Sequence, residues 1–236
     1  YFLAPKKRGK FTITQATIEI EGEIYKTLPL NILVTAAVDK PTNPNDPNYI
    51  VSENIHLVAE ISKTNPYLNE AITVVYKLFV SPKVRLSNLR EIDAPRYNDF
   101  WSQNLTVKEF KLQRGTYKGE DYNYVLVRRM VLYPQKSGKL EIEPLALNIS
   151  VDVPTNRRDF FGGRVMKTVH KTVATPSRII TVKLLPEEGK PDNFTGAVGN
   201  FNFKVTTSKK ELKATEALQA TIEVSGKGNL KLFKLP

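Results

Sequence analysis

Apolar and polar side chains alternate along most of this 236-residue chain, and this period of two is the feature that most constrains its fold. The alternation is clearest in residues 54–62, 72–80 and 218–224. It places every second side chain on one face of an extended strand, whereas a helix would need a period of 3.6. Pro, Gly and Asn separate the short runs, a pattern typical of antiparallel sandwiches. We therefore expect an all-β fold built from antiparallel β-sandwich domains.

Two short motifs each occur twice. Leu3-Ala4-Pro5-Lys6-Lys7-Arg8-Gly9-Lys10 is similar to Leu132-Tyr133-Pro134-Gln135-Lys136-Ser137-Gly138-Lys139, at an offset of 129 in the numbering (138 − 9 = 129). Glu70-Ala71 and Glu216-Ala217 each begin an alternating run, at an offset of 146 (216 − 70 = 146). The first motif reads as a hairpin, and the two glutamates are expected to cap a turn or to hold register. One face of a strand should carry Ile72, Val74, Tyr76 and Leu78, superposed on Leu218, Ala220, Ile222 and Val224.

The two offsets are unequal (146 − 129 = 17), which predicts an insertion in the second copy. In the first copy, the Lys26-Thr27 pair follows Gly9 by 17 positions (26 − 9 = 17). In the second copy, the similar Lys171-Thr172 pair follows Gly138 by 33 positions (171 − 138 = 33). The second copy is therefore longer by about 16 (33 − 17 = 16), and we assign the extra residues to 151–166.

The repeats divide the chain into parts of three immunoglobulin-like units. Residues 40–48 contain three prolines in nine positions and cannot lie inside a sheet. Half a sandwich leaves an apolar face and unpaired edges exposed, so we expect the parent protein to be longer at both ends. The predicted parts are the C-terminal part of a first unit (1–38), a Pro/Asn-rich linker (39–50), a complete unit (51–185) and the N-terminal part of a third, truncated unit (186–236).

Two stretches of the complete unit, 82–104 and 151–166, are expected to be loop insertions. Long loops on a rigid sandwich are common binding sites, and Trp, Tyr and Arg are frequent interface anchors. Trp101 and Phe100 either fill the sandwich core, which we favour, or face a partner. The second loop adds Arg157, Arg158, Phe160 and Phe161. The candidate partner-binding residues of the first loop are Arg90, Asp93, Arg96, Tyr97 and Asp99.

Composition argues against several function classes. The absence of cysteine excludes disulfides, thiolate zinc sites and thiol nucleophiles, and two histidines are too few for a multi-histidine metal site. The net charge of +11 is spread along the chain without a basic helix, so we expect no nucleic acid partner. No apolar run is long enough to span a bilayer. We predict no catalytic residue, no metal and no cofactor.

A glycine-rich motif in the last third of the chain carries a family resemblance. It runs Phe194-Thr-Gly196-Ala-Val198-Gly199-Asn-Phe201 and is followed by Gly226-Lys-Gly228-Asn229. With the two Pro-x-Lys-x-Gly-Lys hairpins, it resembles BatD, a family of the bacterial aerotolerance operon, over essentially the whole chain. The motif lacks the Lys-Ser/Thr of a phosphate loop, so its glycines are expected to serve backbone bends and close packing.

The resemblance implies a location and a role. BatD proteins look like exported tandem immunoglobulin-like chains in the periplasm or cell envelope, anchored to the inner membrane by a segment that this chain does not contain. Their operon neighbours include membrane-anchored proteins with von Willebrand A-type domains, whose metal site Asp93 or Asp99 could complete. This implies a non-enzymatic protein-interaction module. The alternative is a carbohydrate-binding or polysaccharide-handling β-sandwich protein, for which Trp101 would have to lie flat and exposed.

Overall fold

The computed structural model describes residues 9–34, 43–107 and 110–233, and the all-β prediction is confirmed. The N-terminal part contains β1 (Gly9–Ile13), β2 (Thr17–Ile20), β3 (Glu23–Lys26) and β4 (Leu30–Val34). The central part contains α1 (Pro47–Asn54), β5 (Ile55–Ile61), β6 (Ile72–Val80), β7 (Arg85–Asp93), β8 (Phe100–Asn104), β9 (Leu112–Tyr117), β10 (Glu120–Pro134), β11 (Gly138–Ile142), β12 (Ala146–Arg158), β13 (Arg164–Ala174) and β14 (Arg178–Val182). The C-terminal part contains β15 (Gly199–Thr207) and β16 (Ala220–Gly228).

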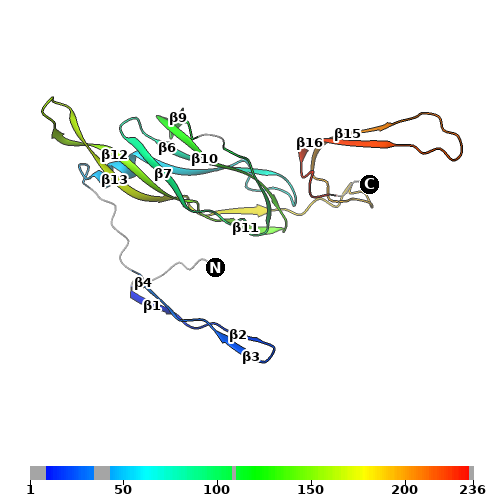
Figure 1. Cartoon of the computed structure of the whole chain (residues 1–236), viewed down its shortest axis with the longest axis horizontal. Helices are drawn as coiled ribbons and strands as arrows, with labels where there is room; N and C mark the ends of the chain where they lie inside the picture. Colours follow the sequence, from blue (N-terminus) through cyan, green and yellow to red (C-terminus); the bar gives the residue numbers. More distant parts are fainter. Residues whose placement is uncertain (1–8, 35–42, 108–109, 234–236) are drawn as a thin grey trace.

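The central part is a sandwich of antiparallel sheets (Figure 1). One sheet has the order β5-β6-β10-β8, with β9 paired to β10; the others are β13-β12-β7 and the pair β11-β14. Buried side chains from all three sheets form one apolar cluster. The predicted register of β6 is confirmed, because its alternate side chains are all fully buried: Ile72, Val74, Tyr76 and Leu78.

A short helix occupies the end of the expected linker. Asp46 caps α1, since its carboxylate accepts a hydrogen bond from the Asn48 N–H at 2.7 Å, and Pro47 occupies the first turn, where no N–H partner is needed. Val51 is fully buried against the sandwich. The linker prediction is therefore corrected for 47–50, while its residues 39–42 lie outside the described ranges.

Most of both expected loop insertions is strand. In 82–104, β7 pairs with β12 and β8 pairs with β10, which leaves 94–99 as the connecting turn. In 151–166, the strands β12 and β13 continue to the pair Arg158–Arg164, so that only 159–163 form a turn. β7 lies at the edge of its sheet and residues 156–168 form the projecting end of the β12–β13 hairpin, so the side chains of these two segments are mostly exposed and show little apolar alternation. The start of the second stretch differs, because Val151 and Val153 are fully buried in the core.

The first repeat motif leads into the same local hydrogen bonds in both copies. The Thr175 N–H donates to the Leu145 carbonyl and the Leu145 N–H donates to Thr175 Oγ1, both at 3.0 Å. Thr27 and Ala16 make the same two bonds, both at 2.9 Å. Leu145 follows Ala16 by 129 positions (145 − 16), whereas Thr175 follows Thr27 by 148 (175 − 27). The β12–β13 hairpin is therefore longer than the β2–β3 hairpin by 19 residues (148 − 129) and not by 16, because the residue equivalent to Thr27 is Thr175 and not Thr172.

The second repeat motif has a shared turn. The Ser62 N–H donates to the Thr73 carbonyl at 3.0 Å, and the Thr73 N–H donates to Ser62 Oγ at 2.9 Å. In the β15–β16 turn, Ser208 and Gln219 make the corresponding bonds at 2.9 and 3.1 Å. Ser208 and Gln219 each follow their counterparts, Ser62 and Thr73, by 146 positions, so the β5–β6 and β15–β16 hairpins close with the same pair of hydrogen bonds.

The repeated glutamates hold these turns closed. Glu70 forms an ion pair with Lys63 at 2.7 Å, and its carboxylate also accepts the Tyr67 N–H at 2.8 Å. Glu216 pairs with Lys209 at 3.1 Å, and both members of this pair keep the same offset from the first pair (216 − 70 = 209 − 63 = 146). The glutamates therefore act locally within each turn.

Equivalent apolar positions differ in burial between the parts. Ile142 is 1% exposed in the central sandwich, whereas Ile13 at the same place beside β4 is 41% exposed. Tyr76 is fully buried, whereas Ile222 is 41% exposed. Nothing within the described residues covers these faces of the first and last parts. Over the same ranges, no helix is long and apolar enough to cross a membrane.

Candidate partner-binding surface

The turn 94–99 joins β7 to β8 and carries most of the predicted partner-binding residues. Beneath it lies the buried Glu143, whose carboxylate accepts the Arg96 N–H at 3.0 Å and the Asn98 Nδ2 amide at 3.3 Å. Arg90 on β7 and Arg96 in the turn both have exposed side chains. The buried carboxylate thus fixes the backbone of the turn, and two cationic side chains remain at its surface.

The two candidate acids of this surface have different surroundings. Asp99 has a positive φ of 64°, and its carboxylate forms an ion pair with Lys136 at 2.6 Å. Asp93 ends β7, where its backbone pairs with Ala146, and its exposed carboxylate has no hydrogen bond or ion pair within the described part of the chain. Asp93 is therefore the acid that can be offered to a partner without first breaking an internal contact.

Tyr97 does not face outward as expected. Its hydroxyl donates to the Tyr76 hydroxyl at 3.4 Å, and its ring packs against the apolar cluster. Burial raises the pKa of both phenols above the ordinary tyrosine value. Tyr97 anchors the turn to the core, which corrects its assignment as a freely exposed contact.

Phe100 and Trp101 lie on opposite faces of β8. Phe100 is buried in the apolar cluster, as expected of a core residue. Trp101 is half-buried outside that cluster, with its ring edge-to-face against Tyr133 (centroids 5.4 Å apart) and Lys231 Nζ at 6.0 Å from its centroid. Trp101 therefore does not fill the core, which corrects the favoured expectation, and its half-exposed ring is partly covered by Tyr133 and Lys231.

A cleft of about 600 Å³ lies beside Trp101, where the sandwich meets the segment after β16. Its walls come from β6, β8 and β10 on one side and from residues 226–232 on the other. The Tyr133 hydroxyl bridges the two sides by donating to the Gly228 carbonyl at 3.0 Å. Burial raises the pKa of Tyr133. The residues that line the cleft include two aromatics, Trp101 and Tyr133, and two lysines, Lys227 and Lys231.

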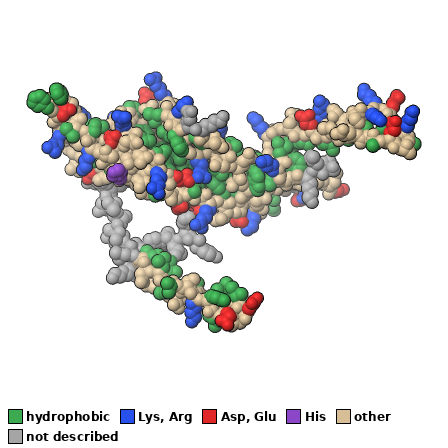
Figure 2. Space-filling model, in the orientation of Figure 1, with side chains coloured by type: hydrophobic (Ala, Val, Ile, Leu, Met, Phe, Trp, Pro, Cys, Tyr) green, Lys and Arg blue, Asp and Glu red, His purple; other side chains and the backbone are tan. Residues whose placement is uncertain are grey.

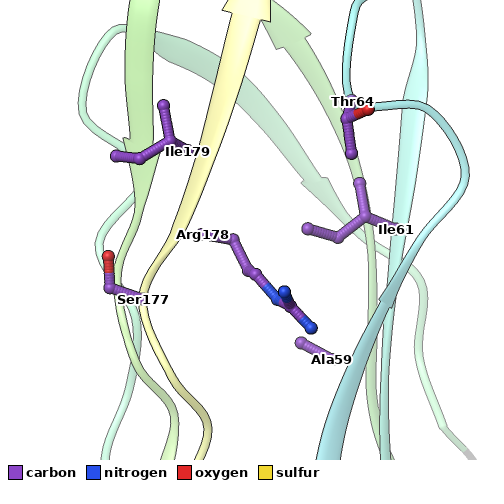
Figure 3. A pocket seen from close by; sticks show the side chains of 6 residues that line it. All are labelled: Ala59, Ile61, Thr64, Ser177, Arg178 and Ile179. Atoms are coloured by element: carbon purple, nitrogen blue, oxygen red, sulfur yellow. The ribbon is translucent and has the colours of Figure 1, made fainter.

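A smaller cavity of about 340 Å³ opens between β5 and β14. Figure 3 shows Arg178 extending from β14 toward Ala59 and Ile61, whereas the Ile179 side chain points to the other side of β14. Further along, β14 approaches the β5–β6 turn, where the Thr181 N–H donates to the Thr64 carbonyl at 2.9 Å. The cavity is therefore an opening between two strands, lined by apolar and polar side chains in equal measure, with one guanidinium.

Metal-binding side chains do not gather anywhere in the described ranges, where no group of three His, Cys, Asp or Glu is close enough to hold an ion. The family model of the BatD DUF11-like domain matches residues 1–34, which include β1 to β4. The resemblance to BatD is confirmed. BatD is a family of membrane-associated envelope proteins. No curated protein matches the chain.

The glycine-rich motif of the BatD resemblance forms one packed unit in the C-terminal part. A Cβ on Gly226 would lie 2.1 Å from the Asn200 carbonyl oxygen, so only glycine allows this approach. The side chain of Asn229, which is 1% exposed, accepts the Val198 N–H and donates to the Gly196 carbonyl, both at 2.8 Å. The amide of Asn229 is therefore engaged in hydrogen bonds to the backbone of the same motif.

The other motif residues complete this unit. A Cβ on Gly199 would meet the Lys227 carbonyl at 2.4 Å, and a Cβ on Gly228 would meet the Phe201 ring at 2.5 Å. The Phe201 ring in turn lies 5.3 Å from the Phe233 ring. Phe194 lines a shallow hollow beside 185–191. The motif therefore clamps the start of β15 to the end of β16.

Proposed function

We propose that the chain is a non-enzymatic protein-interaction module of a bacterial aerotolerance system. In this proposal it acts in the periplasm or cell envelope with membrane-anchored von Willebrand A-type partners. The observation that carries the proposal is the match of residues 1–34 to the BatD DUF11-like domain. The architecture agrees with such a role, because strands and short turns form a rigid frame on which contact residues can be displayed.

The proposed contact is Asp93. A hard divalent cation in the partner takes carboxylate oxygen readily, and the Asp93 carboxylate is exposed without an internal partner within the described residues. The turn beside it is already held by Glu143, so little conformational entropy is lost when a partner binds. Arg90 and Arg96 would lie at the rim, where charges set orientation and association rate.

The test is calorimetry between this chain and the purified von Willebrand A-type domain of an operon neighbour, in the presence of Mg²⁺. Asp93→Asn should weaken binding by about tenfold or more, since the cation loses a carboxylate ligand. Asp99→Asn is the matched control and should change affinity by less than about threefold, because Asp99 already serves Lys136. Binding that ignores both Asp93→Asn and chelation of Mg²⁺ would refute the proposed contact.

Carbohydrate binding is the second candidate function, and the cleft beside Trp101 is the observation that favours it. Two aromatic rings and two lysines line this cleft, but Lys231 lies over the indole and would have to move before a sugar could stack. Titration with soluble peptidoglycan fragments, followed by the fluorescence of Trp101, tests this. A saturable change whose midpoint is shifted by Lys231→Ala would support the sugar, because Lys231 covers the indole; no change would leave the protein partner as the function.

A further inference from the structure

The tip of the β12–β13 hairpin presents two phenylalanines to solvent. Phe160 is 97% exposed and Phe161 is 92% exposed, and their rings contact mainly each other, edge-to-face with centroids 5.5 Å apart. Figure 2 shows hydrophobic side chains gathered at the free end of this hairpin, well away from the body of the sandwich. Exposed aromatic pairs of this kind mark a contact surface, because water solvates them poorly.

Several hydrogen bonds fix the conformation of the turn that carries these two rings. Asp159 Oδ1 accepts the N–H groups of Phe161 and Gly163 at 3.0 and 2.7 Å, and the Asp159 N–H donates to the Gly163 carbonyl at 2.8 Å. Arg158 Nη1 donates to the Gly162 carbonyl at 3.0 Å, and the positive φ of Gly162 (83°) permits the reversal. The turn is thus fixed with both rings outward, instead of folding them back onto the strands.

Basic side chains flank the aromatic pair in the sequence, and we call this group of residues the cationic collar. Four exposed basic side chains lie within 157–167, and the single acid among them, Asp159, is occupied by backbone N–H groups. The local formal charge is therefore +3 (4 − 1 = 3). The basic residues are Arg157, Arg158, Arg164 and Lys167.

We propose that this tip docks on an anionic lipid membrane, with Phe160 and Phe161 inserted at the boundary between headgroups and acyl chains. The cations would then face lipid phosphates, an arrangement that combines apolar insertion with electrostatic attraction. A projecting tip whose exposed cations flank an apolar pair suits a deformable anionic surface. The docking is independent of the proposed partner contact, because Asp93 pairs with Ala146 at the opposite end of β12.

Co-sedimentation with lipid vesicles tests the proposal. The chain should bind vesicles of phosphatidylcholine with phosphatidylglycerol and should release as the salt concentration rises, because salt screens the collar. Phe160→Ser with Phe161→Ser should lower the partition coefficient by about tenfold or more, and Arg157→Glu with Lys167→Glu should lower it at least as much. The matched control is Leu212→Ser with Lys210→Glu on the β15–β16 turn, which is also exposed and basic and should bind like wild type.

A second measurement separates insertion from simple charge attraction. Because the chain contains no cysteine, Phe160→Cys introduces a single site for an environment-sensitive fluorophore. Its emission should shift to the blue on anionic vesicles, whereas the same label at Leu212→Cys should not shift. The proposal is overturned if the wild-type chain does not sediment with anionic vesicles, if the phenylalanine variant binds as well as wild type, or if the label at 160 stays in water.

Discussion

Replacing Thr175 with valine should destabilise the central sandwich by about 1–3 kcal/mol, the cost of leaving a buried donor without an acceptor. Thr175 is 3% exposed, and its Oγ1 accepts the N–H of the fully buried Leu145 at 3.0 Å. Valine fills nearly the same volume, so no cavity forms and the loss comes from the hydrogen bond. Urea unfolding, followed through the fluorescence of Trp101, should show a lower midpoint, and the melting temperature should fall by about 4 °C for each kcal/mol.

Thr27→Val is the control for this prediction. Thr27 makes the same bond to the Ala16 N–H, but both residues are exposed and water can replace the hydroxyl. The change should cost less than about 0.5 kcal/mol and leave the Trp101 transition unmoved. An unchanged urea midpoint for Thr175→Val, or equal shifts for the two variants, would show that burial does not determine how much this hydrogen bond contributes to the free energy of unfolding.

Three further outcomes are expected. Gly226→Ala should open the β15–β16 ladder, because the added Cβ would lie 2.1 Å from the Asn200 carbonyl; faster amide exchange along both strands would report it. Asn229→Ala should remove the side-chain acceptor of the Val198 N–H and speed exchange of that amide by about tenfold or more. Burial raises the pKa of Glu70, but hydrogen bonds from a lysine and a backbone amide outweigh this and hold it below its usual 4.5. The stabilisation is therefore present above pH 4.5 and lost as the pH falls through the folded-state pKa, so Glu70→Gln should flatten the acid limb of a urea-midpoint profile.

The strand register could be predicted wherever one face of a strand is buried. Every second residue from Ile72 to Leu78 is apolar because one face of β6 packs in the core, so the sequence itself shows which face is buried. The turn glutamates Glu70 and Glu216 were predictable for a similar reason. Each occupies a fixed place in a repeated motif, and a local ion pair needs no knowledge of the rest of the fold.

Strands with little burial could not be found this way. β7 reads as a loop because Arg85, Ser87 and Asn88 face solvent at a sheet edge, where alternation carries no hydrophobic signal. The helix α1 did leave a signal, the cap Asp46 followed by Pro47, but it lies inside a Pro-rich stretch that favours a linker interpretation. The side of β8 on which Trp101 lies depends on strand pairing that no local pattern specifies.

The paired hydrogen bonds between Thr175 and Leu145 mark the start of the long β12–β13 hairpin, whose length has a mechanical consequence. Beyond them, β12 runs from Ala146 to Arg158, a reach of about 40 Å at the usual rise of a strand, whereas the equivalent β2 spans only about 10 Å. The first residues of β12, Ala146 to Asp152, are also paired with β7, so the hairpin loses the support of a third strand only after the pair Asp152–Arg85. A force applied at the tip would bend the hairpin at that point, next to the fully buried Val151 and Val153, and would therefore reach the core of the sandwich.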